Sequence, residues 1–189
     1  MSQADDLGAD LGASTERRLL RSVVQVARHA FGAAAASVFL VDPDTGELVF
    51  EAVAGEGDDK LVGTRFPAGT GIAGWVAASG QTMLVDDLRE SRQFSTEAAE
   101  STGYVPDSIM AAPLFSGDAC IGVLEVLDRG AFMPAREMAD VALLDLLADQ
   151  AAIGLELLTR LRATSPDLRS DKAMQLLAMA EALLANTHG

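Results

Sequence analysis

The amino-acid sequence predicts an α+β fold, in which an antiparallel sheet has helices at its two sequence ends. Two observations carry this prediction. The middle of the chain holds two pairs of β-favouring segments, each pair joined by a short turn, and amphipathic helical patterns flank them on both sides. The chain has 189 residues, of which 49% are hydrophobic, and this is enough for one domain with appended elements.

The N-terminal part is predicted to change from disorder to helix. Residues 1–15 are rich in Gly, Ala, Ser and Asp, and we expect them to form a disordered lead-in. From Glu16 to Phe31 apolar side chains recur at helical spacing, and Gly32 stands where helices commonly end. This apolar stripe consists of Leu20, Val24, Ala27 and Phe31.

Two β-hairpins are predicted in the body of the chain. Ser37 to Val41 and Leu48 to Val53 are rich in branched and aromatic residues, and the turn sequence from Asp42 to Gly46 separates them. The apolar runs Ser108 to Phe115 and Cys120 to Leu127 are separated by a Ser-Gly-Asp turn. We expect this second hairpin to be buried.

Shorter elements are expected between the hairpins. Gly55 to Arg65 is polar and acidic, which is typical of a loop. Apolar residues at helical spacing predict a short helix that starts near Gly71 and stops at Gly80. Thr82 to Val85 is predicted to be a short strand, and Ser91 to Ser101 a weak, polar helix.

The longest periodic segment runs from Pro134 to Leu161 and predicts a long helix. Its apolar residues alternate spacings of three and four, which is a heptad pattern. The pattern consists of Val141, Leu144, Ala148, Ala151, Leu155 and Leu158. Two interpretations stay open: packing on the sheet, or pairing with a partner helix in a dimer.

A break is predicted after this helix. Ala163 to Ser165 form this break, and Ser165, Pro166 and Asp167 are typical of the first residues of a new helix. Residues 163–189 are therefore expected to form a connector or an extra helix, outside a domain that spans residues 16–162.

Composition excludes several function classes. The net charge of -14, with scattered arginines, leaves no cationic stripe for nucleic acid or an anionic membrane. Cys120 is the only cysteine, so no intramolecular disulfide is possible, and neither His29 nor His188 has neighbours at metal-ligand spacing, so no metal site is expected. The sequence shows no signal peptide and no apolar run that could span a bilayer, so we expect a cytoplasmic protein.

Three segments, in this order, resemble the GAF domain, the small-molecule sensor module of phosphodiesterases, cyclases, histidine kinases and bacterial transcriptional activators. They are Gly69 to Asp87 (GTGIAGWVAASGQTMLVDD), Ser108 to Val126 (SIMAAPLFSGDACIGVLEV) and Phe132 to Ile153. The resemblance implies a GAF/PAS-like central sheet with the terminal helices on one face and a ligand cap of short helices and loops on the other. It also implies a sensory domain rather than an enzyme.

In this family the ligand lies between the sheet and the cap, which here would be Gly55 to Tyr104. The resemblance therefore implies a small-molecule site in which aromatic and polar side chains of this region contact the ligand. The candidates are Phe66, Thr70, Trp75, Asp86, Asp87, Phe94, Tyr104 and Ser108. For each of them, core packing or helix capping without a ligand is the alternative.

The ligand class is narrowed by comparison with family signatures. Cyclic-nucleotide-binding members share a dispersed Asn-Lys-Phe-Asp-Glu signature, and the corresponding residues here are Asp128, Arg129, Phe132, Arg136 and Glu137. Only Phe132 and Glu137 fit, so a cyclic-nucleotide-binding regulatory domain is a minor alternative. Three other family activities are not expected, because the chain lacks the residues that they need. Bilin attachment needs a cysteine in the cap, haem binding needs a suitably placed histidine, and the reductases of this fold need several cysteines. The ligand stays unidentified, and no cofactor is assigned.

Two functions stay open. The first is a sensor that binds a small molecule and relays the signal through the terminal helices of a homodimer in a bacterial-type pathway, to a downstream output domain or protein. The second is a ligand-free module for dimerisation and relay. The predicted dimer interface consists of Leu20, Val24, Phe31, Leu144, Leu155 and Leu158.

Overall fold

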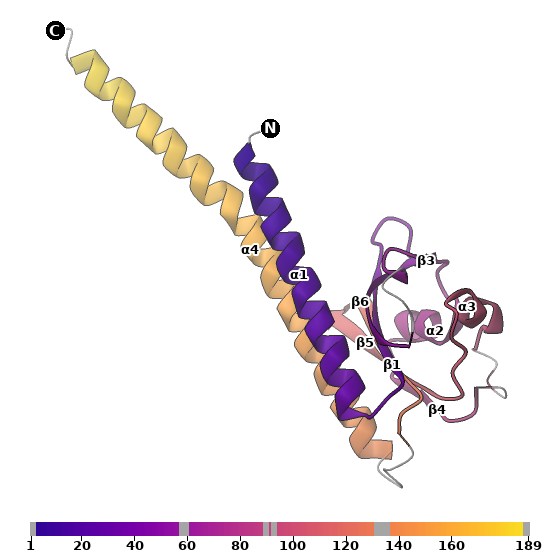
Figure 1. The fold of residues 1–189 in the computed structure, drawn as a ribbon. Coiled ribbons are helices and arrows are strands. Elements are labelled where there is room, and N and C mark those ends of the chain that lie inside the picture. Colours follow the sequence, from indigo (N-terminus) through magenta and orange to yellow (C-terminus); the bar gives the residue numbers. More distant parts are fainter. Residues whose placement is uncertain (1–2, 57–60, 89–90, 92–93, 131–136, 187–189) are drawn as a thin grey trace.

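A computed structural model of the chain has one antiparallel sheet with long helices on one face and short elements on the other (Figure 1). The structure describes residues 3–56, 61–88, 91, 94–130 and 137–186. The six strands lie in the order β3-β2-β1-β6-β5-β4, and every neighbouring pair is antiparallel. They are β1 (Ala35–Val41), β2 (Leu48–Gly55), β3 (Arg65–Phe66), β4 (Met83–Val85), β5 (Ile109–Ser116) and β6 (Ala119–Leu127).

The helices confirm the predicted layers. The first and last, α1 (Gln3–Ala30) and α4 (Glu137–Asn186), lie side by side on one face of the sheet (Figure 1). The short helices α2 (Gly71–Ser79) and α3 (Thr96–Ser101) lie on the opposite face, as the cap of the predicted fold. Within the described residues, none of the helices combines the length and the apolar character needed to cross a membrane.

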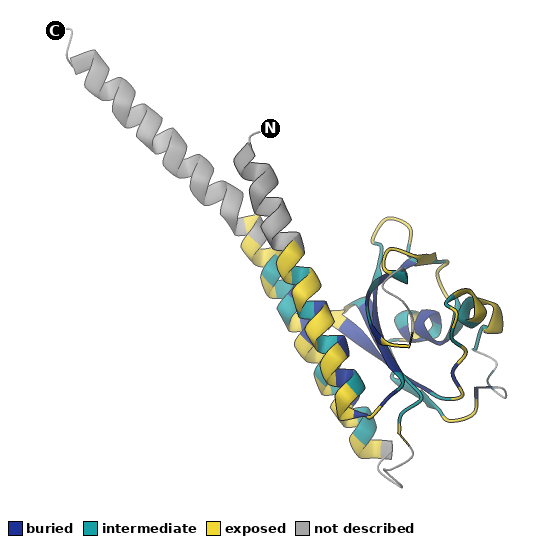
Figure 2. Ribbon diagram, in the orientation of Figure 1, coloured by how far each residue is buried: buried dark blue, intermediate teal, exposed yellow. Residues whose placement is uncertain are grey.

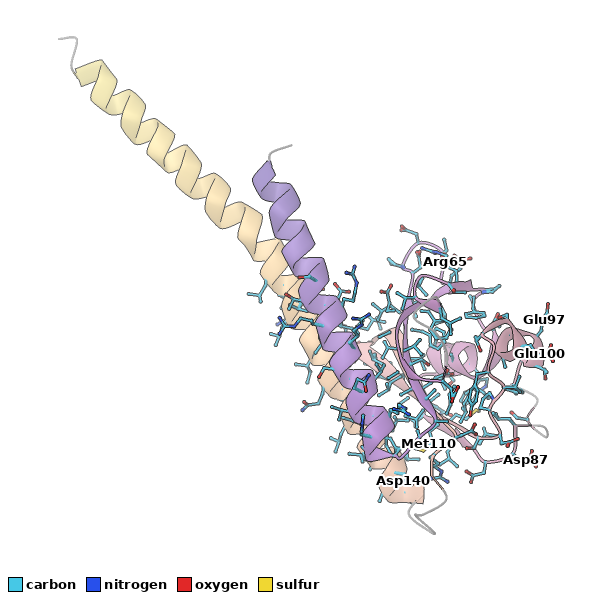
Figure 3. The ribbon with its side chains drawn as sticks, viewed as in Figure 1. Arg65, Asp87, Glu97, Glu100, Met110 and Asp140 are labelled. Atoms are coloured by element: carbon cyan, nitrogen blue, oxygen red, sulfur yellow. The ribbon has the colours of Figure 1, made fainter. Side chains whose placement is uncertain are left out.

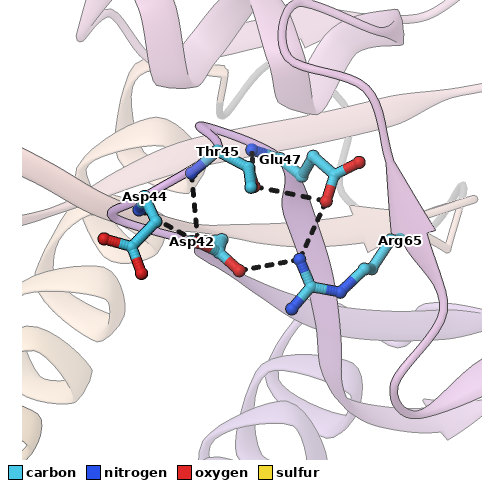
Figure 4. Close-up of polar contacts among 5 residues, drawn as sticks. All are labelled: Asp42, Asp44, Thr45, Glu47 and Arg65. Carbon is cyan, nitrogen blue, oxygen red and sulfur yellow. Dashed lines mark hydrogen bonds and ion pairs between the residues drawn. The ribbon is translucent and has the colours of Figure 1, made fainter.

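Both predicted hairpins form, and the turn of the first is fixed by polar contacts (Figure 4). The Asp42 carboxylate accepts hydrogen bonds from the backbone N–H groups of Asp44 (3.0 Å) and Thr45 (3.2 Å). Arg65 reaches back from β3 to Asp42 (2.7 Å) and Glu47 (2.8 Å). The Arg65 guanidinium lowers the pKa of Asp42 below its usual value. These contacts pin the edge strand β3 to the β1–β2 turn.

The structure corrects two expectations about the chain ends. Helix α1 begins at Gln3, so the disordered lead-in predicted for residues 1–15 is wrong from Gln3 onward. Alanine and leucine favour helix there, and acidic residues near its start suit the helix dipole. Helix α4 continues to Asn186 without the break predicted at Ala163 to Ser165. The segment beyond Pro166 is rich in Ala, Leu and Met, whose summed helix propensity outweighs one proline.

The predicted dimer interface instead fills the core between the sheet and the long helices. Side chains alternate between the two faces of the sheet, and those on the helix side form one apolar core with the inner stripes of α1 and α4. Figure 2 shows buried residues on both long helices and in the strands of the sheet. The exposed fraction of Leu144 is 0% and that of Leu155 is 6%, and Leu158 is partly buried. Leu20, Val24 and Phe31 of α1 lie in the same core. Five of the six residues are therefore unavailable to a partner.

Helix α4 carries a second apolar stripe that faces solvent. Its members are between 39% and 64% exposed, and at 100° per residue they point away from the buried stripe on the same helix. They are Leu143, Leu146, Ile153, Leu157 and Leu161. Helix α4 therefore has apolar surface that the sheet does not use, and this surface lies on the face opposite the buried stripe.

Candidate functional site

The cap is held on the sheet by helix α2 and the glycine turn before it. Thr70 precedes the helix in extended conformation, and the helix ends at Gly80, whose φ of +66° suits glycine. A Cβ on Gly74 would lie 2.3 Å from the carbonyl carbon of Gly69, so the helix packs against this turn only because residue 74 is a glycine. Ile72 and Val76 are buried against the sheet.

A cavity of about 100 Å³ lies between the cap and the sheet. This is several times the space that one water molecule needs, which is about 10–15 Å³ on the same measure. Its lining is mostly apolar, and both the sheet and the cap contribute aromatic rings. These rings belong to Phe39, Phe50, Phe66, Phe94 and Tyr104. The cavity has the position and the lining expected of a small-molecule site.

Three phenylalanines form a continuous aromatic wall. The ring of Phe39 on β1 lies 4.0 Å from that of Phe50 on β2 and 6.2 Å from that of Phe66 on β3, centroid to centroid. The Phe50 and Phe66 rings are 5.8 Å apart in an edge-on arrangement. Three neighbouring strands thus supply one apolar surface to the cavity.

Two polar side chains stand on the sheet side of the cavity. Ser37 on β1 and Glu125 on β6 are cross-strand partners, and they are 3% and 7% exposed. Burial raises the pKa of Glu125 to about 7. The neighbouring Ser37 hydroxyl opposes this shift in part, but its Oγ has no partner of good hydrogen-bond geometry within the described residues. An unsatisfied buried hydroxyl costs about 1–3 kcal/mol.

The structure brings together half of the predicted ligand-binding residues. Phe66, Thr70, Phe94 and Tyr104 line the cavity. Trp75 packs against the apolar core beneath the cap without lining the cavity.

The three remaining candidates lie elsewhere. Asp86 and Ser108 line a separate surface depression beside the start of α4. Asp87 is exposed on the outside of the cap, far from the long helices (Figure 3). These three residues remain candidates only for ligand contacts outside the cavity.

A polar network connects this depression with the cap and with α4. Asp128, at the end of β6, accepts hydrogen bonds from the Tyr104 hydroxyl and from the backbone N–H groups of Asp107 and Ser108, both at 2.8 Å. Asp128 has a φ of +48°, which is uncommon for a residue other than glycine. Burial and the bond to Asp128 raise the pKa of Tyr104 to about 12.

Arg129, which follows Asp128 in the chain, extends the network to the long helix α4. Arg129 donates hydrogen bonds to Asp140 on α4 at 2.8 Å and to Asp86, just after β4, at 3.0 Å. Its guanidinium is largely buried, with a side-chain exposure of 18%. A chain of direct contacts therefore runs from a cavity-lining residue, Tyr104, to the first turn of α4.

Sequence reasoning missed Ser37, Phe39, Phe50 and Glu125. For Glu125 a signal was available, because it is the only charged residue in the apolar run from Ile121 to Leu127, and a buried charge needs a reason. The others look like ordinary strand residues. Only the strand order shows that they share a face with Glu125.

The structure describes the contacts of two of the five residues that correspond to the cyclic-nucleotide signature. Asp128 and Arg129 are engaged in the internal network, while Phe132, Arg136 and the side chain of Glu137 lie outside the described part. Cys120 lies on β6, half-buried, with its thiol 3.2 Å from the Gly122 carbonyl oxygen, and it does not line the cavity.

The chain is similar in sequence to proteins of a known family. A family model described as GAF domain matches residues 15–155. A probable 3',5'-cyclic phosphodiesterase, pde-5, of Caenorhabditis elegans is 27% identical over 116 residues, which cover 57% of this chain and 16% of that protein. The cone cGMP-specific 3',5'-cyclic phosphodiesterase subunit alpha' of Gallus gallus is 33% identical over 76 residues, which cover 38% of this chain and 9% of that protein. The chain thus spans less than a fifth of the length of these curated relatives.

Solved structures share the same architecture. The GAF domain from a phosphoenolpyruvate-protein phosphotransferase of Coxiella burnetii is similar with a TM-score of 0.67 and 23% identity, over 80% of this chain and 86% of that one. The GAF-B domain of DevS from Mycobacterium smegmatis gives 0.63 and 19%, over 79% and 98%. The free methionine-R-sulfoxide reductase of Neisseria meningitidis gives 0.62 and 24%, over 85% and 95%. At these identities the likeness shows a common fold.

Proposed function

The chain belongs to the GAF domain family, and on that basis we propose that it is a regulatory sensor without catalytic activity of its own. In this proposal a small molecule binds in the cavity beneath the cap, and the resulting change passes through the terminal helices of a homodimer to a downstream output domain or protein. The cytoplasmic, bacterial-type setting expected from the sequence stays part of the proposal.

The cavity is the observation that carries this proposal. It combines an aromatic wall with two buried polar groups, Ser37 and Glu125, and this combination is typical of ligand sites rather than of packed cores. A core built for stability alone would avoid a hydroxyl without a partner beside a buried carboxyl group. A bound ligand offers the missing hydrogen-bond partner.

The polar network supports a route from the cavity to the long helix. Tyr104 contacts the cavity and holds Asp128, and Arg129 holds Asp140 at the start of α4. A ligand that moves the cap changes the contacts of Tyr104 first. The start of α4 then moves with the end of β6, because adjacent residues of one chain make both contacts.

The exposed stripe of α4 supports pairing with a second copy of this chain. Leu146 and Ile153 are seven residues apart, and Leu157 and Leu161 follow at intervals of four, which is close to the repeat by which two helices pack. A second copy presents the same stripe, so the contact is self-complementary. In this proposal the exposed stripe forms the dimer interface, in place of the buried residues that were predicted for it from the sequence.

Thermal unfolding with a metabolite panel tests the binding step. A ligand that binds only the folded chain raises the midpoint, because it stabilises that state by RT ln(1+[L]/Kd). The variant Ala99→Trp fills the cavity from the cap and should abolish the shift. Its matched control, Glu100→Trp, adds the same side chain to the exposed side of α3 (Figure 3) and should retain the shift.

Sedimentation of the same samples separates the two functions that the sequence left open. A dimer that responds to no compound on the panel favours the ligand-free relay module. A monomer that binds a metabolite contradicts the relay through a homodimer. A dimer with a ligand-induced shift supports the full proposal.

A further inference from the structure

The charges around the cavity restrict what it can hold. The described residues that line it include two carboxyl groups, on Glu56 and Glu125, and no Lys, Arg or His. The other polar side chains are hydroxyls, on Ser37, Thr70 and a few residues of the cap. An anionic ligand would face carboxylates without a compensating cation in this part of the chain.

Ser37 and Glu125 form one polar spot in an apolar surface. They are register partners on neighbouring strands, so their side chains stand on the same face of the sheet within a few ångströms of each other. Ser37 is nine-tenths or more buried, lines the cavity and has an Oγ without a hydrogen-bond partner in the described chain. A ligand group placed here meets two hydrogen-bond acceptors.

The aromatic wall begins beside this spot. Phe39 follows Ser37 by two residues on β1, so both side chains point into the same space, and the rings of Phe50 and Phe66 continue the wall. A positive charge is attracted to the faces of such rings. The wall therefore suits the apolar body of a ligand and also the charged end of a cation.

We propose that this cavity selects a small organic cation, whose protonated nitrogen donates hydrogen bonds to the Glu125 carboxylate and to Ser37 Oγ, and whose apolar body packs against Phe39, Phe50 and Phe66. The proposal rests on the proposed sensory function and names the ligand class of the same site.

A bound cation would also change the ionisation of the Glu125 carboxyl group. Without a positive partner, burial raises the pKa of Glu125 to about 7, so the carboxyl group is largely neutral in slightly acidic solution. A bound cation supplies the opposite charge, stabilises the carboxylate and releases the proton to solvent. A neutral ligand gains nothing from this change.

Three aromatic probes of similar size test the ligand class: phenethylammonium, 2-phenylethanol and phenylacetate. Titration calorimetry at pH 8 should give binding of phenethylammonium about tenfold tighter than that of the alcohol and no binding of phenylacetate. Glu125→Gln should remove the advantage of the cation over the alcohol. Glu51→Gln is the matched control, because Glu51 is a half-buried strand carboxyl that interacts with charges on α1 and does not line the cavity.

The outcomes distinguish this proposal from the sensory function itself. Tightest binding of the alcohol or of phenylacetate overturns the cation proposal and leaves a small-molecule sensor standing. Absence of binding by all three also overturns it, and the metabolite panel then decides the sensory function separately. If Glu125→Gln does not fold, Ser37→Ala replaces it, and an unchanged preference for the cation in that variant contradicts the proposed contact.

Discussion

The hydroxyl of Tyr104 donates a hydrogen bond to the carboxylate of Asp128, which joins the cap over the cavity to the strand end that precedes α4. The same carboxylate holds the backbone of Asp107 and Ser108. One side chain thus organises the return of the chain from the cap into β5.

Removal of this hydroxyl should loosen the cap. We expect Tyr104→Phe to lower the free energy of unfolding by about 1 kcal/mol, and Asp128→Asn by about 2 kcal/mol, because the second change also weakens two backbone hydrogen bonds. Urea unfolding measures both values, and hydrogen exchange at residues 102–108 should be faster in both variants. Equal exchange rates in Tyr104→Phe and the parent chain would show that the bond does not hold the cap.

The buried carboxyl group makes stability depend on pH. Burial raises the pKa of Glu125 from 4.5 to about 7, so the unfolded chain loses this proton at lower pH than the folded chain. The contribution of Glu125 is therefore most favourable below about pH 4.5, declines as the pH rises to about 7, and costs about 2.5 kcal/mol more at pH 8 than at pH 5.

Glu125→Gln lacks this titration, so its stability relative to the parent chain should be greater at pH 8 than at pH 5 by that amount. Urea unfolding of the parent chain and of Glu125→Gln at the two pH values checks this. A difference that does not change with pH would mean that Glu125 titrates normally in the folded chain.

Binding of phenethylammonium should also depend on pH. With a pKa of about 7 for Glu125, affinity should fall about tenfold from pH 8 to pH 6, as the carboxylate becomes protonated while the amine stays charged. The other titratable groups that line the cavity are Glu56 and Tyr104. Calorimetry in buffers of different ionisation enthalpy should show proton release at pH 7. A constant affinity, with no proton released, contradicts a contact between the cation and Glu125.

Aspartate substitutions in the two apolar stripes of α4 should have different effects. Leu155→Asp buries an unpaired carboxylate in the core and should unfold the chain, since such changes cost about 3–5 kcal/mol. Ile153→Asp together with Leu157→Asp changes only the exposed stripe and should give a folded monomer. Circular dichroism and sedimentation separate the two results. A double variant that still dimerises would place the interface elsewhere.

Local patterns in the sequence predict most of the fold. The Asp42 to Gly46 turn, the stop of α2 at Gly80 and the inner stripe of α4 all depend on neighbours within a few residues. The lead-in and the expected break near Pro166 were wrong because helix propensity summed over a long segment outweighed a few unfavourable residues.

The candidate site was harder to predict. Phe66, Thr70, Phe94 and Tyr104 follow from their place in the cap, but Ser37 and Glu125 are 88 positions apart (125 − 37) and meet only through the pairing of β1 with β6. The dimer residues were misassigned for a related reason. Periodicity shows that a helix has apolar faces, and it does not show which face the sheet covers.

Because α4 is uninterrupted, it extends far beyond the sheet. Its 50 residues span about 75 Å at 1.5 Å per residue, and Leu155, the last core residue in the part of the helix whose burial is described, lies about 47 Å from its C-terminal end. A tilt of about 5° at the sheet moves the far end by roughly 4 Å, which is most of the rise of one helical turn. In the proposed relay α4 would therefore act as a lever, because a displacement of atomic size near Asp140 would become one that is large enough to change how side chains interlock at the far end of the helix.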